Sequence, residues 1–320
     1  MSTKGGLSRV FTDVLIGKTY RKEYIRGIEK EIQSLRQYNE YIYRLNSIHK
    51  KKVDEINWEE IKATKPPTKL IKSNKYQELA KNNLDRYKPS FFDKRLGLEK
   101  FKKKRLMKKL ETAKQADERE YLEIVKTYEQ EYKKWKENYD MACRVLGGVP
   151  KSYIELVTQL EERLKDLIWA KMSFFVKDRY TAEVILEMDR NKVIPKFEIA
   201  WTKSGGVKIK EMPKSRFNEL YQFYVCSSVL RVAKELFGNL PLKLILIHCT
   251  EKCLNTITGH MEVITLLSVG ISRKILSSLN FEMLHPPDSI NNFVNNMKFK
   301  KLKGFSPVEK IRISDFNSEK

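Results

Sequence analysis

Cysteine, histidine, glycine and long apolar runs are all scarce in this chain of 320 residues. The four cysteines, Cys143, Cys226, Cys249 and Cys253, lie within ordinary helix-like and strand-like patterns, so we interpret them as reduced thiols. No stretch approaches the roughly 20 apolar residues that span a bilayer, so we expect no transmembrane segment. The first residues lack the apolar core of a secretion signal. These absences predict a cytoplasmic protein.

Catalytic motifs are also missing. The sequence contains neither G-x-x-x-x-G-K-[ST] nor G-x-G-x-x-G, so no phosphate-cradling loop is visible. It contains no G-x-S-x-G and no H-E-x-x-H. The four histidines are too widely spaced to indicate a catalytic pair. We therefore expect no cofactor, and we favour a binding or scaffold protein over an enzyme.

Positive charge is abundant and unevenly distributed. The formal net charge is +22, of which residues 1–150 carry +14. Such a surplus favours anionic partners, namely nucleic acid, an acidic protein or an anionic membrane. The alternative is a lysine-rich surface that only keeps a long helical arm soluble.

The first half of the chain has helical periodicity. Apolar residues recur at spacings of three and four over about 20–50, and a further helix is predicted over about 73–87. Residues 93–146 contain no proline and a single glycine, Gly97, and predict a helix about 80 Å long. Such a helix must project, or fold back on helix 20–50 as an antiparallel coiled coil. Residues 1–147 are therefore predicted to form a basic helical arm, and self-association through this arm is one alternative to binding an anionic partner.

The pattern changes after Pro150. Helices are expected over 152–170, 214–237, 272–279 and 289–297, and strands over 173–176, 182–188, 197–202, 207–210, 242–248 and 262–271. The turn at 204–206 indicates a hairpin between two of these strands. The sequence thus predicts the α+β class, with a compact mixed α/β domain at 148–297 and a basic tail at 298–320.

Two basic segments are candidates for binding an anionic partner. In the first, a basic amphipathic helix carries Lys100, Lys102, Lys103, Lys104, Arg105, Lys108 and Lys109. It could lie along phosphates or on anionic lipid, the latter with help from Phe91 and Phe92, or it could be a solvated coiled-coil face. In the second, Lys298, Lys300, Lys301 and Lys303 alternate with phenylalanines. That pattern suits single-stranded nucleic acid, but is more typical of an edge strand with alternate residues buried.

A metal site is a weaker hypothesis. His248, Cys249, Cys253 and His260 include residue types that ligate zinc. Their spacing fits no common zinc module, and adjacent strand residues such as His248 and Cys249 point to opposite faces. We therefore expect no metal at these residues.

The enzymatic alternative is a metal-dependent nuclease. The order helix, three strands, helix, strand is similar to nuclease cores that place an acid on one strand and Glu-x-Lys on the next. Here Glu187 and Asp189 end one predicted strand and Glu198 begins another. Carboxylates near a lysine could hold Mg²⁺ and polarise a phosphate. However, Ala200 occupies the place of the lysine, so such an active site would be degenerate.

Five phrases carry a resemblance to a known family. They are LNSIHK at 45–50 with Trp58 after it, PSFFD at 89–93, MPKSRF at 212–217, LNTITGH at 254–260 and MKFKKLKGF at 297–305. Over about 40–310, the chain resembles a family of uncharacterised bacterial proteins. The resemblance implies a bacterial cytosolic protein and assigns no catalytic residue.

Overall fold

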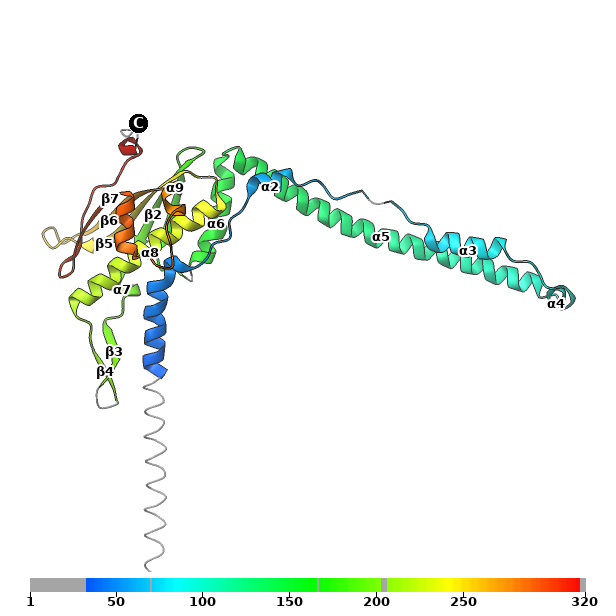
Figure 1. Cartoon of the computed structure of the whole chain (residues 1–320), viewed down its shortest axis with the longest axis horizontal. Coiled ribbons are helices and arrows are strands. Elements are labelled where there is room, and N and C mark those ends of the chain that lie inside the picture. The colour runs from blue at the N-terminus through cyan, green and yellow to red at the C-terminus, as the bar shows by residue number, and fades with distance from the viewer. Residues whose placement is uncertain (1–32, 70, 166, 203–205, 317–320) are drawn as a thin grey trace, which may run out of the picture. The chain divides into compact units, whose positions relative to one another are not determined.

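The computed structural model describes residues 33–316, except 70, 166 and 203–205. The chain forms two compact units. The described residues up to Ile56 and those from Gly147 onward form one, which we call the sheet unit, and Asn57–Leu146 form the other, which we call the hairpin unit (Figure 1). The long helix and the strand-rich C-terminal region confirm the α+β class. Residues 33–56, which the sequence assigned to the arm, belong instead to the sheet unit.

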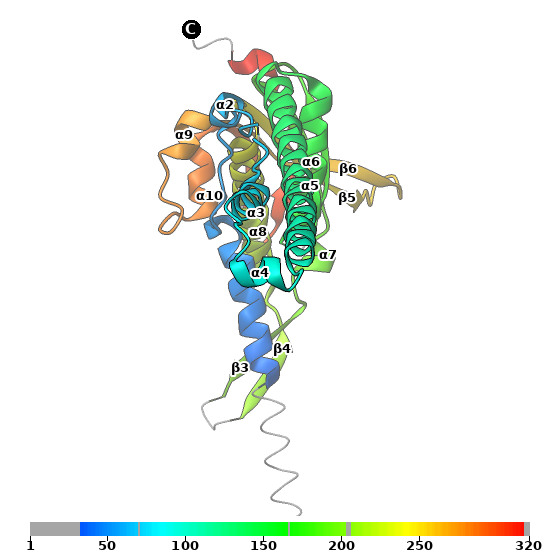
Figure 2. The same cartoon turned by 90° about the vertical axis from the view of Figure 1, so that its right-hand side faces the viewer.

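The hairpin unit is built on one long helix. Its elements are α2 (Trp58–Ala63), α3 (Lys75–Asp85), α4 (Phe91–Arg95) and α5 (Glu99–Leu146). The 48 residues of α5 extend over about 72 Å at the usual helical rise. Both α2 and α3 pack on α5, and α4 lies in the connection where the chain turns back (Figures 1 and 2). The single predicted helix over 93–146 is thus broken near Gly97, whose positive φ of 65° ends α4.

A carboxylate on α5 fixes α3 in register. Asn74 precedes α3 but makes no side-chain cap. Asp117 of α5 instead accepts hydrogen bonds from the backbone N–H groups of Tyr76 at 3.0 Å and Gln77 at 2.8 Å. The first N–H groups of a helix have no partner within it, so a buried acceptor there stabilises the helix end.

The aromatic stripe of α5 is partly covered by the chain segment that precedes the bend. Tyr128, Tyr132, Trp135 and Tyr139 form a continuous series with ring centroids 5.4–6.0 Å apart. The Trp135 indole donates a hydrogen bond to the carbonyl of Thr64 at 2.8 Å. Within this unit, α5 therefore folds against α2 and α3. Helix 20–50 was the partner considered from the sequence, but its described part lies in the other unit.

The sheet unit contains a mixed six-stranded sheet in the order β1-β2-β5-β6-β7-β8. Its strands are β1 (Lys171–Val176), β2 (Thr181–Met188), β5 (Leu244–Leu254), β6 (Met261–Ser272), β7 (Val294–Lys300) and β8 (Gly304–Ser306). β2 and β5 are parallel, and every other neighbouring pair is antiparallel. The predicted hairpin, β3 (Phe197–Trp201) with β4 (Val207–Glu211), forms a separate two-stranded sheet.

Two helices cover one face of the large sheet. They are α6 (Pro150–Leu164) and α8 (Lys214–Asn239), and α8 belongs to the crossover between the parallel strands. Alternate β2 residues are buried, and Leu186 lies with Leu164 of α6 and Val232 of α8 around one small cavity. The short helices α7 (Arg190–Val193), α9 (Arg273–Ser277), α10 (Pro286–Ser289), η2 (Ile290–Asn292) and η3 (Ile313–Phe316) lie in connections or at the end of the described chain.

The C-terminal segment covers part of the opposite face. The backbone N–H of Ile311 donates to the Ser268 hydroxyl at 2.8 Å, and the ring of Phe316 lies directly over Gly270. A Cβ at Gly270 would lie 1.9 Å from that ring, so only glycine leaves room for it. The last described residues of the chain therefore cover Ser268 and Gly270 in the second half of β6.

Residues 33–56 pack along α8. Residues 33–47 are helical and are followed by η1 (Ile48–Lys50). The His49 ring Nδ1 lies 3.2 Å from the Ser227 hydroxyl, and the Ile56 N–H donates to the Gly238 carbonyl at 2.8 Å. Because the sheet lies on one side and this segment on another, 18 of the 26 residues of α8 are buried.

The sequence prediction for residues 289–297 was wrong. We expected a helix there, but the helical conformation ends at Asn292 and β7 begins at Val294. Residues of β7 are alternately exposed and half-buried, as in a strand with one face toward solvent, and four asparagines lower the helical preference of this stretch. The expected basic tail correspondingly begins inside β7.

Candidate functional site

The strongest candidate surface is the bend of the hairpin unit, which we call the hairpin tip and define as residues 86–109. It contains eleven lysines and arginines but only two acids, for a net charge of +9. Lys100, Lys103, Lys104, Arg105, Lys108 and Lys109, all predicted to bind an anionic partner, are exposed there. Lys102, which was also predicted to bind an anionic partner, instead forms an ion pair with Asp93, with 2.5 Å between Nζ and Oδ1.

Asp93 organises the bend. Its carboxylate accepts a hydrogen bond from the Ser90 N–H at 3.2 Å, and its backbone carbonyl accepts one from the Leu98 N–H at 2.9 Å. The hydrogen bond from Lys102 lowers the pKa of Asp93. The carboxylate thus stays charged at neutral pH and joins α4 to the first turns of α5.

Large apolar side chains protrude from this basic surface. Phe91, Phe92, Leu96 and Phe101 are each 67–71% exposed, and Leu98 is 40% exposed. Phe91 and Phe92 contact each other edge to face, with centroids 6.1 Å apart. Side chains of this size on a well-defined turn contribute nothing to a core, and such patches mark interaction sites.

The second basic segment is a folded edge. Lys298 and Lys300 are exposed on β7, whereas Lys301 pairs with Glu219 at 2.7 Å and Lys303 lies in the turn before β8. Phe305 is buried against Tyr221, and Phe299 contacts Phe305. Because the phenylalanine rings pack against the sheet unit and against each other, they do not form the exposed stacking face that binding to single-stranded nucleic acid would require.

The suggested zinc ligands do not converge. His248 contacts Ser268 at 2.8 Å on one face of β5, and Cys249 is buried on the other. Cys253 lies near Glu251, and His260 is exposed in the β5–β6 turn. Across residues 33–316 and outside the gaps noted above, no group of three or more His, Cys, Asp or Glu side chains is placed to hold a metal ion.

The suggested nuclease carboxylates are divided between two sheets. Glu187 and Asp189 line a cleft of about 1220 Å³ at the carboxyl ends of β2 and β5. Glu187 pairs with Lys171 at 3.7 Å, and Asp189 caps α7 through the Asn191 N–H at 3.1 Å. Glu198 lies on the separate β3–β4 hairpin and pairs with Lys210 at 3.1 Å. β2 and β3 are not neighbours, so the strand arrangement of the expected nuclease core is not formed.

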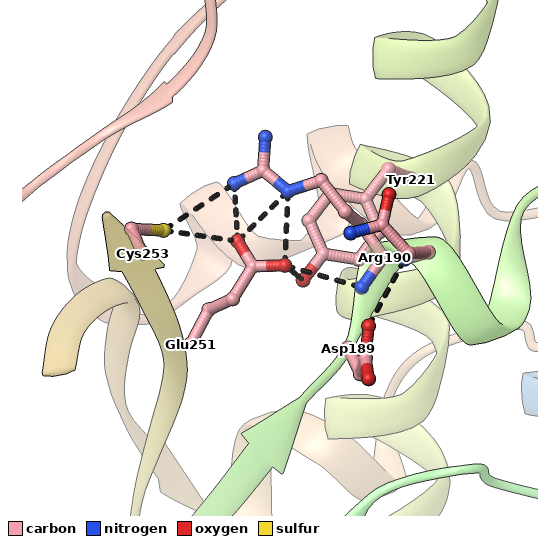
Figure 3. Close-up of polar contacts among 6 residues, drawn as sticks. Asp189, Arg190, Tyr221, Glu251 and Cys253 are labelled. Carbon is pink, nitrogen blue, oxygen red and sulfur yellow. Dashed lines mark hydrogen bonds and ion pairs between the residues drawn. The ribbon is translucent and has the colours of Figure 1, made fainter. Parts of the chain in front are cut away.

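Sequence reasoning missed the buried polar cluster beside this cleft. Arg190, Tyr221, Glu251 and Cys253 meet there, although they come from three separate segments (Figure 3). The available signal was Glu251 itself, because an acid at the end of the buried part of a long strand requires a partner.

Comparison with known proteins gives no relative. No family model matches the chain, nor does any curated protein or solved structure. The resemblance to a bacterial family therefore stays a prediction. Among the described residues, no helix combines the length and apolar character required to cross a membrane.

Proposed function

We propose that this chain is a non-enzymatic binding protein that attaches to an anionic lipid surface through its hairpin tip. The observation that carries the proposal is the exposure of Phe91, Phe92 and Phe101 beside unpaired lysines. The partner is expected to accept apolar side chains and positive charge at the same place.

The physical chemistry of a bilayer interface meets both requirements. Aromatic and leucine side chains gain free energy when they enter the boundary between head groups and acyl chains. Lysines near an anionic leaflet contribute about 1 kcal/mol each, and they can keep their charged ends in the head-group layer. A bend that carries both kinds of side chain can enter such a surface without unfolding.

The aliphatic residues favour lipid over nucleic acid among the anionic partners. Lysines and phenylalanines alone would also suit a single strand, whose bases stack on aromatic rings. Leu96 and Leu98 add exposed aliphatic surface at the same bend. That surface gains from contact with acyl chains, whereas phosphates and base faces offer it little.

Co-sedimentation of the full chain with vesicles tests the proposal. We expect binding to vesicles containing phosphatidylserine, weak binding to phosphatidylcholine alone, and loss of binding as salt rises. The apolar test variant is Phe91→Ser/Phe92→Ser/Phe101→Ser. Its matched control changes three exposed apolar residues of the sheet unit, Phe197→Ser/Met283→Ser/Leu302→Ser.

Charge variants separate the electrostatic attraction of the tip lysines to the membrane from the insertion of the apolar side chains. Lys100→Gln/Lys103→Gln/Lys104→Gln removes three tip charges, and Lys133→Gln/Lys134→Gln/Lys136→Gln removes three exposed charges elsewhere on α5. We expect the tip variants to bind anionic vesicles roughly tenfold less tightly or worse, and the controls to bind like the unmodified chain. Equal loss in tip and control variants would contradict the proposal. So would binding to single-stranded DNA or RNA that is tighter than binding to vesicles and equally sensitive to the tip variants.

A further inference from the structure

We infer that the cleft at the carboxyl ends of β2 and β5 binds a small organic anion, whose carboxylate or phosphate group contacts the Nη1 amino group of Arg190. The cleft lies wholly within the sheet unit, and its volume is about 1220 Å³. The carboxyl ends of parallel strands are the usual place for ligands in α/β sheets. β2 and β5 are the parallel pair of this sheet, and Met188, Thr250 and Glu251 of these strands line the cleft.

A buried carboxylate fixes the orientation of Arg190. Glu251 is only 5% exposed, and its two oxygens accept hydrogen bonds from Arg190 Nε at 2.9 Å and from Nη2. The backbone N–H of Arg190 also donates to Glu251, at 3.1 Å. The hydroxyl of Tyr221 donates to the same carboxylate at 3.1 Å. Burial raises the pKa of Tyr221, so this phenol stays protonated as a donor.

The Nη1 amino group is left for a ligand. Figure 3 shows the Nε and Nη2 edge of Arg190 turned toward Glu251 and Cys253, with Nη1 directed away from them. Among the described residues, none forms a hydrogen bond to Nη1, and 28% of the Arg190 side chain is exposed. A buried ion pair contributes little net stability, whereas a rigidly held guanidinium is well suited to recognise a carboxylate or a phosphate.

The rest of the cleft wall indicates the remainder of the ligand. Lys165, Lys171, Lys192, Lys252 and Lys310 surround the space and outnumber the acids that line it. Leu254, Met261 and Val263 form an apolar side, and each is 58–64% exposed. A molecule with one anionic group and an apolar body therefore fits better than a bare inorganic anion.

The test uses phenyl phosphate and benzoate as probes, with inorganic phosphate and the neutral benzyl alcohol for comparison, in calorimetric titrations of the full chain. We expect saturable binding of at least one organic anion, weaker binding of inorganic phosphate and none of benzyl alcohol. Arg190→Lys should weaken the affinity for the organic anion roughly tenfold or more. A lysine cannot pair with Glu251 as the guanidinium does and at the same time present a second amino group to the ligand. Arg163→Lys, a change at an exposed residue outside the cleft, should leave the affinity for the organic anion unchanged.

A second variant keeps the inference testable if Arg190→Lys does not fold. Lys252 is an exposed residue of the cleft wall, so Lys252→Glu should fold normally. Its affinity for the organic anion should still be several-fold lower. The inference is overturned if neither organic anion binds the unmodified chain, if both cleft variants bind it normally, or if inorganic phosphate binds as tightly as phenyl phosphate. These titrations involve the sheet unit and no lipid, so they are independent of the vesicle experiment.

Discussion

The carboxylate of Asp117 on α5 accepts a hydrogen bond from the backbone N–H of Gln77 on α3 at 2.8 Å, and so joins two helices through residues that lie 40 positions apart in the chain. The same carboxylate also accepts the N–H of Tyr76. Asp117 thus accepts hydrogen bonds from the first N–H groups of α3, which is the role that an N-cap residue of the same helix ordinarily has.

Asp117→Ala should destabilise the hairpin unit. Loss of a helix cap costs about 1–2 kcal/mol, and the two N–H groups would lose their acceptor. Urea unfolding followed by circular dichroism, together with proteolysis near α3, measures the effect. Asp140→Ala, an exposed change on the same helix, is the control. Equal stability of the two variants would show that the contact contributes nothing.

Stability should fall in acid because of His49. Burial, followed by the nearby charges of Lys50, Lys234 and His285, lowers the pKa of His49 to about 4. In the unfolded chain the pKa returns to about 6.5. The unfolded state then binds a proton that the folded state does not, so stability is lost as pH falls from about 6.5 to about 4, by roughly 3 kcal/mol.

Unfolding free energies at pH 7.5, 5.5 and 4 check this prediction. The quantity to compare is the difference between the unmodified chain and His49→Phe, which has no imidazole to titrate. We expect that difference to shift in favour of the variant as pH falls. His260→Asn, a change in the exposed β5–β6 turn, supplies the control. A difference that does not change with pH would contradict the prediction.

Gly270→Ala should displace the C-terminal segment from the sheet. The added Cβ would overlap the Phe316 ring. A substitution that overfills such a contact costs roughly 1–3 kcal/mol. The double variant Gly270→Ala/Phe316→Ala should recover part of this loss, because the clash is removed. Thermal unfolding of the single and double variants measures the coupling, and strict additivity would rule out the proposed overlap.

Arg273→Lys should weaken the end of α8. The Arg273 guanidinium donates to the carbonyls of Phe237 at 2.6 Å, Leu240 at 2.5 Å and Leu242 at 2.7 Å. Lysine cannot reach the three acceptors with one planar group, so we expect a loss of about 1–3 kcal/mol in urea unfolding. Arg119→Lys, an exposed change on α5, should cost far less.

Local patterns were sufficient to predict the long helix and most strands. The spacing of Tyr128, Tyr132, Trp135 and Tyr139 predicts one face of α5, and the glycines near 205 predict the β3–β4 hairpin. A narrow apolar stripe shows that a helix has a partner but does not identify it. For that reason, residues 33–47 could not be assigned to the sheet unit from their own sequence.

The cleft depends on contacts that no local pattern contains. Arg190 and Glu251 lie 61 residues apart. They meet only because β2 and β5 pair in parallel, and that pairing is determined by the whole crossover. The exposed Phe91 and Phe92 were visible in the sequence. Their solvent exposure could not be predicted, because it depends on how the other helices of the hairpin unit pack around the bend.

Unit order along the chain has a consequence for synthesis on the ribosome. The hairpin unit is an insertion, since Asn57–Leu146 interrupts the sheet unit. His49 is made 178 residues before Ser227, its partner on α8. The hairpin unit can therefore fold on the ribosome before α8 has been synthesised. At that stage Leu45 and Ile48, which are both buried in the folded protein, have no surface to pack against. Nascent chains halted before α8 should accordingly contain a folded hairpin and an N-terminal segment accessible to chaperones.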